Sequence, residues 1–174
     1  MTPIISIVGR SNSGKTTFLE KMVRELKSRH YRVAVIKHDT HGFEIDHPGK
    51  DTWRMAQAGS DVVMISSPNK IAMIKKTSKE LTLDQLQAQI IDEVDIILTE
   101  GYKMGDKPKI EISRAEVGNK LLCSKEELLA LVTDQSFDLD VPHFDIDDVC
   151  GVVELLISDV LRPEQESKGI FAIP

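Results

Sequence analysis

Gly9-Arg10-Ser11-Asn12-Ser13-Gly14-Lys15-Thr16, a stretch near the start of the chain, matches the phosphate-binding loop pattern G-x-x-x-x-G-K-[ST] at every fixed position. Gly9 lets the chain turn sharply off a preceding strand, and Gly14 lets the backbone approach phosphate oxygens with no side chain in the way. The backbone N–H groups of residues 11–16 then point at the anion, beside the positive end of the following helix. The stretch therefore predicts a site for the phosphates of a nucleotide.

The residues on either side of this loop predict its structural setting. Residues 3–8 are β-branched and mostly apolar, as in a buried parallel strand, and residues 32–37 repeat that pattern. Between them, residues 15–30 carry apolar side chains at helical spacing. Strand, loop, helix and strand form a right-handed βαβ unit. We therefore expect an α/β protein of the three-layer P-loop NTPase type, with a mostly parallel central sheet.

The rest of the chain supplies further elements for this fold. Residues 61–66 and 70–76 predict two strands joined by turn chemistry at 67–69, and hence an added β-hairpin. Capping boxes at Thr82 and Ser124 predict a helix to about residue 91 and one or two helical turns. The remaining expected elements are a helix at 50–59, strands at 94–99, 110–112 and 129–132, and a helix from 147 or 148. We expect one domain over residues 1–162 and a loosely ordered tail over 163–174.

Three residues are suited to act on the phosphates and their metal ion. Lys15 places a point charge between the β- and γ-phosphates, and the Thr16 hydroxyl is suited to coordinate Mg²⁺. Glu100 ends an apolar run at 96–99, and ligands bind at the carboxyl ends of such strands. We expect Glu100 to act through a metal-bound water or by orienting the attacking water. The alternative for Glu100 is a solvated side chain in a turn, and Asp95, which precedes the strand, is expected to face water.

The segment at residues 37–52 is rich in polar groups and is expected to leave the same sheet edge as the phosphate-binding loop. Its carboxylates are candidates for binding Mg²⁺ or activating water, with Asp39 as a catalytic candidate, and its lysines are candidates for contacting phosphate. His38, His41 and His47 leave a transition-metal site open as an alternative, although their spacing matches no tight ligand template. The candidate nucleotide-binding residues of both segments are Gly9, Arg10, Ser11, Asn12, Ser13, Gly14, Lys15, Thr16, Thr17, Lys37, His38, Asp46, Lys50 and Asp51.

Recognition of the base is less clearly encoded. Guanine needs a carboxylate that accepts its N1–H and N2–H groups, but the Asn/Thr-Lys-x-Asp pattern of regulatory GTPases is absent. Thr133 and Asp134, after the strand expected at 129–132, are the best-placed candidates; the alternative is a strand-end turn. These residues alone leave both ATP and GTP open.

Composition narrows the class of protein. The 174 residues carry 22 Lys plus Arg and 28 Asp plus Glu, a net charge of −6, which argues against non-specific binding to nucleic acid. No apolar run approaches the ~18–20 residues of a membrane-spanning helix, and the first residues lack the features of a secretory signal. Cys123 and Cys150 form no C-x-x-C pair and are read as free thiols in a reducing cytoplasm.

Several motifs in this order resemble those of the molybdopterin-guanine dinucleotide biosynthesis protein B (MobB) family. They are the phosphate-binding loop, Lys37-His38 with His41, residues 46–52 (Asp-His-Pro-Gly-Lys-Asp-Thr), Ala58-Gly59, residues 99–103 (Thr-Glu-Gly-Tyr-Lys) and Val132-Thr133-Asp134. The resemblance covers about residues 3–160. One departure is local: members of the family carry adjacent histidines after Lys-His-x, whereas here Thr40-His41 is followed by Gly42.

The resemblance implies a function that the residues alone do not. The nucleotide would be GTP with Mg²⁺, hydrolysed weakly, and the protein a homodimer to which residues 61–76 contribute. It would act as an adapter for the guanylyltransferase that joins GMP to molybdopterin. Its partners would be that transferase and the molybdenum-insertion protein, with molybdopterin itself a further candidate ligand. A small-molecule kinase, a metal-delivery GTPase and a non-hydrolysing binding module are the alternatives.

Overall fold

The structure is a computed structural model that describes residues 2–90 and 93–162. The chain divides into two compact units. The first comprises the residues up to His38 and those from Ile90 onward, and the second comprises Asp39–Gln89. The tail expected at 163–174 lies outside the described residues.

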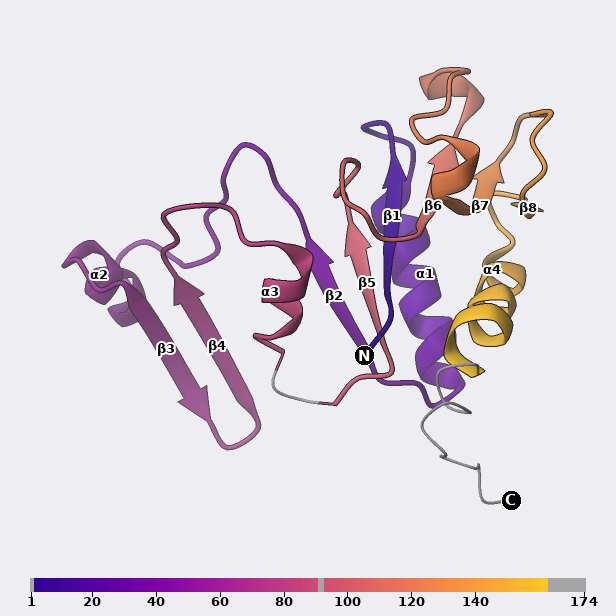
Figure 1. The fold of residues 1–174 in the computed structure, drawn as a ribbon. Coiled ribbons are helices and arrows are strands. Elements are labelled where there is room, and N and C mark those ends of the chain that lie inside the picture. Colours follow the sequence, from indigo (N-terminus) through magenta and orange to yellow (C-terminus); the bar gives the residue numbers. More distant parts are fainter. Residues whose placement is uncertain (1, 91–92, 163–174) are drawn as a thin grey trace, which may run out of the picture. The chain divides into compact units, whose positions relative to one another are not determined.

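A six-stranded parallel sheet forms the framework of the first unit. Its strands lie in the order β2 (Val33–Lys37), β5 (Ile96–Glu100), β1 (Ile4–Gly9), β6 (Lys109–Ser113), β7 (Leu128–Thr133) and β8 (His143–Phe144) (Figure 1). All five pairings between neighbouring strands are parallel. The predicted α/β fold with a mainly parallel sheet is therefore confirmed.

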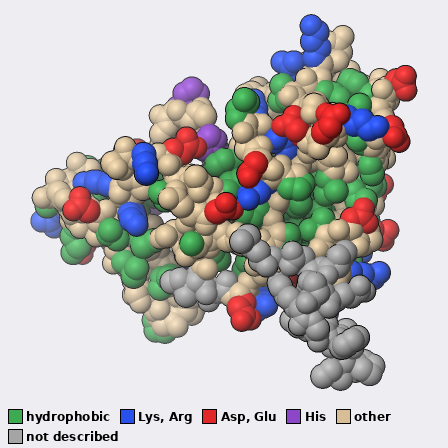
Figure 2. Space-filling view, viewed as in Figure 1, with side chains coloured by type: hydrophobic (Ala, Val, Ile, Leu, Met, Phe, Trp, Pro, Cys, Tyr) green, Lys and Arg blue, Asp and Glu red, His purple; other side chains and the backbone are tan. Residues whose placement is uncertain are grey.

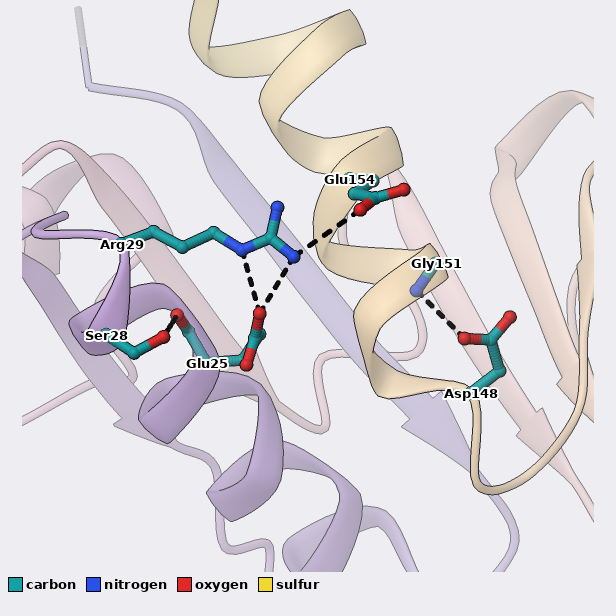
Figure 3. A network of polar contacts seen from close by, with 6 residues as sticks. All are labelled: Glu25, Ser28, Arg29, Asp148, Gly151 and Glu154. Carbon is teal, nitrogen blue, oxygen red and sulfur yellow. Dashed lines mark hydrogen bonds and ion pairs between the residues drawn. The ribbon is translucent and has the colours of Figure 1, made fainter.

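Two helices pack against one face of this sheet and against each other. They are α1 (Lys15–Ser28) and α4 (Val149–Leu156), which continues as a π-helical turn over Ile157–Leu161. Their apolar stripes meet alternate residues of the strands, such as Ile5, Ile7, Ile96 and Leu98, in one core. At the surface, Arg29, the C-cap of α1, binds Glu25 and lies 3.6 Å from Glu154 of α4 (Figure 3).

The opposite face of the sheet buries polar side chains. The Thr99 hydroxyl donates to the Ser6 hydroxyl at 3.0 Å. Lys109, only 1% exposed, donates to the Gly105 carbonyl and the Glu127 carboxylate. Glu111, also 1% exposed, accepts the backbone N–H groups of Leu122 and Cys123. Buried charges must be paired to be tolerated, so Lys109 and Glu111 bind groups of the segments at 102–108 and 118–127. These bonds attach both segments to the sheet.

The second unit contains two short helices and the predicted hairpin. Helix α2 spans Asp51–Gln57, strands β3 (Val62–Ser67) and β4 (Lys70–Lys75) pair antiparallel, and helix α3 spans Leu83–Gln87. Thr82 and Gln85 form the predicted capping box. None of the helices in the described part of the chain is long and apolar enough to cross a membrane.

Some predicted boundaries were wrong. Helix α1 ends at Ser28 and not at residue 30, because His30 takes a left-handed conformation (φ +68°) that cannot continue a helix. Helix α3 ends at Gln87, before the residue 91 that was expected, and residue 91 itself lies outside the described residues. The second capping box opens only the 3₁₀ turn η2 (Lys125–Glu127), and a second 3₁₀ turn, η1, spans Ala115–Val117.

Candidate functional site

The phosphate-binding loop connects the end of β1 to the start of α1. Gly9 has φ +151°, and a Cβ atom there would collide with the Ile112 carbonyl of β6 and lie 2.7 Å from the Ser13 hydroxyl. Gly14 has φ +85° and stands at the N-cap of α1. Of the remaining loop residues, Ser13 is buried, whereas Arg10, Ser11, Asn12 and the helical Thr17 are exposed. The loop thus has the strand-to-helix setting that phosphate binding at a helix N-terminus requires.

Lys15 folds back over this loop. Its ammonium group donates to the Arg10 carbonyl at 2.7 Å. Burial lowers the pKa of Lys15, the Glu100 carboxylate partly opposes this shift, and Lys103 and Lys37 add to it. A phosphate bound in the loop would supply the negative charge that favours the protonated ammonium.

Thr16 and Glu100 meet at the edge of the sheet. The Thr16 hydroxyl lies 3.0 Å from each carboxylate oxygen of Glu100, and Lys37 lies 3.8 Å from the same carboxylate. The Glu100 side chain is only 12% exposed. Glu100 ends β5, which pairs with β1 on one side and β2 on the other, so the sheet itself brings the three residues together. A hydroxyl and a carboxylate are hard oxygen donors, so this pair fits Mg²⁺.

The turn after β5 is held by His38. The His38 backbone N–H donates to the Glu100 carbonyl at 2.9 Å, and the His38 ring stacks on Tyr102 with a centroid separation of 4.4 Å. Tyr102 adopts φ +55° to reach this position. His38 therefore supports the backbone that carries Glu100.

Arg114 is a site residue that the sequence analysis missed. It directly follows β6, and its guanidinium lies within about 3.5 Å of the position that a Cβ atom would take on Gly14. A cleft on this side of the loop is lined by Arg10, Ser13, Ser113, Arg114, Gly118 and Lys120, among others. No local pattern signals this contact, because it joins residues that are far apart in the sequence.

The candidate base-binding residues make contacts at the end of β7. One oxygen of the exposed Asp134 carboxylate accepts the Ala115 backbone N–H at 2.8 Å, and the Thr133 hydroxyl accepts the Gln135 N–H at 3.1 Å. The Thr133 bond is that of a strand-end turn, which was the alternative for this pair, whereas the Asp134 bond reaches the segment that follows β6. Recognition of a base by Asp134 stays a prediction.

The polar segment from Asp39 onward belongs to the second unit. Asp39 accepts the His41 N–H and Asp46 accepts the His47 N–H, each at 2.8 Å, as in local turns. Lys50 is the N-cap of α2, and Asp51 begins that helix, 3.8 Å from Arg54. In residues 2–90 and 93–162, no three His, Cys, Asp or Glu side chains gather as a metal-binding group. The roles predicted for these residues toward the nucleotide stay predictions.

Asp95 was expected to face water, and it is partly exposed but also paired. Its carboxylate accepts the Arg32 backbone N–H at 2.6 Å and lies 3.4 Å from the Arg32 guanidinium, and its side chain is 26% exposed. The Arg32 N–H group, just before β2, needs an acceptor, and Asp95 supplies one. This bond connects the start of β5 to the residue that precedes β2.

Comparisons with known proteins agree with one another. The family model described as molybdopterin guanine dinucleotide synthesis protein B (MobB) matches residues 4–134. A molybdopterin-guanine dinucleotide biosynthesis adapter protein from Haemophilus influenzae is 39% identical over 156 residues, which are 88% of this chain and 87% of that protein. The Escherichia coli protein of the same name is 33% identical over 90% of this chain and 93% of its own length.

Solved structures show the same likeness. A crystal structure of molybdopterin-guanine biosynthesis protein B has a TM-score of 0.69 and 31% identity, covering 89% of this chain and 98% of the other. The crystal structure of Bacillus subtilis MobB has a TM-score of 0.70 and 28% identity, covering 90% and 96%.

Proposed function

The chain belongs to the molybdopterin guanine dinucleotide synthesis protein B (MobB) family, and from this premise we propose that it is a GTP-binding adapter that hydrolyses GTP slowly with Mg²⁺. Its role is that of an adapter in the biosynthesis of molybdopterin guanine dinucleotide. GTP supplies the GMP of that dinucleotide, so a GTP-binding adapter would act where its nucleotide is used.

The single observation that carries the nucleotide proposal is the meeting of Thr16 and Glu100 beside the phosphate-binding loop. Each carboxylate oxygen lies 3.0 Å from the Thr16 hydroxyl, and both groups stand next to Lys15. Mg²⁺ bound there would neutralise charge on the β- and γ-phosphates. The amides of residues 11–16 and the Lys15 ammonium would hold those phosphates, and Glu100 would orient the attacking water.

We expect the partners to be the guanylyltransferase that joins GMP to molybdopterin and the protein that inserts molybdenum, with molybdopterin as a further candidate ligand. All of these would be met in the cytoplasm. Slow hydrolysis fits an adapter, because the GTP-bound form then lasts long enough to bind a partner protein.

A homodimer is part of the proposal, and the hairpin supports it. One face of β3 and β4 exposes Val62, Met64, Ile71 and Met73 to between 43% and 57%. Figure 2 shows hydrophobic side chains at the surface of this part of the molecule. A two-stranded sheet is marginally stable alone, and its unpaired edges favour pairing with another strand. A second copy of this hairpin would cover both the apolar face and an edge.

The dimer is tested by sedimentation. We expect the wild-type chain to sediment as a dimer and the Met64→Lys/Met73→Lys variant as a monomer. Met104→Lys is the matched control, because Met104 is 97% exposed and belongs to the first unit. A wild-type monomer, or a variant that remains dimeric, would contradict the proposed role of the hairpin.

Nucleotide binding is tested by calorimetric titration with GTP and ATP, each with and without Mg²⁺, followed by single-turnover hydrolysis with and without a molybdopterin guanylyltransferase. The proposal predicts tighter binding of GTP than of ATP and slow release of phosphate. Tighter binding of ATP, or transfer of a phosphoryl group to a metabolite, would overturn it.

A further inference from the structure

Arg114 lies on the opposite side of the phosphate-binding loop from Glu100. Strand β1 leads into that loop and pairs with β5 on one edge and β6 on the other. Strand β1 lies between β5 and β6 (Figure 1). Glu100 is the last residue of β5, and Arg114 directly follows β6. The loop is therefore flanked by an acidic group on one side and by a cationic group on the other.

The Arg114 side chain is held in place but incompletely paired. Its Nε is buried and has no hydrogen-bond partner in the described part of the chain. Its only ion pair there is a 3.9 Å contact with Glu116, whose side chain is 72% exposed. A buried N–H group without a partner is uncommon in native proteins and calls for a reason, such as a missing ligand.

The neighbouring side chains on this side of the loop are cationic or carry hydrogen-bond donors. Ser13, which is 1% exposed, also has a buried hydroxyl that finds no partner among the residues the structure describes, and it lines the same cleft as Arg114 and Arg10. Among the described residues, Glu111 is the one carboxylate that lines this cleft, and it already accepts two backbone N–H groups. The turn that carries Arg114 is fixed by Asp134, which accepts the Ala115 N–H.

We propose that Arg114 binds the inner phosphates, α and β, of the nucleotide. This inference rests on the proposed function and deepens it. Lys15, Thr16 and Glu100 would hold the metal and the terminal phosphates on the β5 side, while the base would extend toward Asp134, which follows β7. Strand β6 lies between β1 and β7, so Arg114 stands beside the middle of the nucleotide. A guanidinium presents several N–H donors in a fork that suits phosphate oxygens.

GDP has the α- and β-phosphates but lacks the γ-phosphate. Comparing the affinities for GTP and GDP therefore distinguishes a contact with the inner phosphates from a contact with the γ-phosphate. GTP and GDP are titrated into the wild-type protein and into the Arg114→Gln and Arg114→Lys variants. Arg24→Gln is the matched control, because Arg24 is 75% exposed on α1 and pairs only with Glu20 among the described residues. Thermal unfolding of each variant checks that the fold is retained.

We expect Arg114→Gln to weaken both GTP and GDP by about tenfold or more, to nearly equal extents. Arg114→Lys should restore part of the affinity, and Arg24→Gln should leave both affinities unchanged. Equal affinity in wild type and Arg114→Gln, or a loss confined to GTP, would overturn the inference. If the wild-type chain itself binds no guanine nucleotide, the proposed function fails. If the wild type binds it and Arg114→Gln binds it equally well, only the inference about Arg114 fails.

Discussion

Replacing Glu100 with glutamine removes one negative charge from the place where we expect Mg²⁺. The carboxylate is 12% exposed and lies 3.0 Å from the Thr16 hydroxyl, so it is poorly screened by water. Two unit charges about 4 Å apart interact by about 4 kcal/mol at an effective dielectric constant near 20. After desolvation, hydrogen bonds to charged groups contribute about 1.5–3 kcal/mol. We therefore expect Glu100→Gln to bind Mg²⁺–GTP about 10- to 150-fold more weakly.

The sign of this effect should reverse when the metal is removed. Without Mg²⁺ the Glu100 carboxylate faces a triphosphate of the same sign, so its neutralisation relieves a repulsion. In excess EDTA, Glu100→Gln should bind GTP as tightly as the wild type or more tightly. Calorimetric titration under both conditions measures the crossover.

Asp95→Asn is the matched control for this experiment. Asp95 precedes the other end of β5 and binds the Arg32 backbone. This substitution should leave the Mg²⁺ dependence of GTP binding unchanged. An equal loss of affinity for Glu100→Gln with Mg²⁺ and with EDTA would refute the reasoning, because Glu100 would then act only by holding Thr16.

Three further results are expected. Lys15→Ala should weaken the binding of GTP more than tenfold with or without Mg²⁺, because a charge-assisted contact of roughly 1.5–3 kcal/mol is lost. Unchanged affinity in calorimetry would contradict the assignment of the site. Gly9→Ala should destabilise the fold by about 1–3 kcal/mol, seen as a lower Tm, because its Cβ would meet the Ile112 carbonyl; an unchanged Tm would contradict the loop geometry. At pH 8, iodoacetamide should modify the exposed Cys150 and spare Cys123. Burial and Glu111 raise the pKa of Cys123 to about 12, which leaves little thiolate to react. Equal labelling of the two cysteines in mass spectrometry would contradict this.

Much of the fold could be predicted because its signals are local. The β-branched runs, the glycine loop and the turn at 67–69 each act within a few residues, and the structure places β1, α1 and the β3–β4 hairpin at those positions. Strand β8 was missed because only His143 and Phe144 form it, which is too short for a periodic pattern. The end of α1 was placed too late because a single left-handed residue, His30, stops the helix.

The residues of the candidate site were likewise predictable only where the signal is local. Glu100 was predicted because it ends an apolar strand, and the sheet brings it to Thr16. Arg114 was not predicted, because its approach to Gly14 depends on the pairing of β1 with β6. The bond between Asp95 and Arg32 was missed for a related reason, since Arg32 precedes a different strand. Long-range pairing decides these contacts, and no short pattern in the sequence records it.

The most direct test is a crystal structure of the chain with Mg²⁺ and a non-hydrolysable GTP analogue. The β-phosphate should lie within hydrogen-bonding distance of the backbone amides of residues 11–16, with Mg²⁺ bound to the Thr16 hydroxyl. A nucleotide found elsewhere, with those amides turned to solvent at saturating concentration, would contradict the assignment of this loop as the nucleotide site.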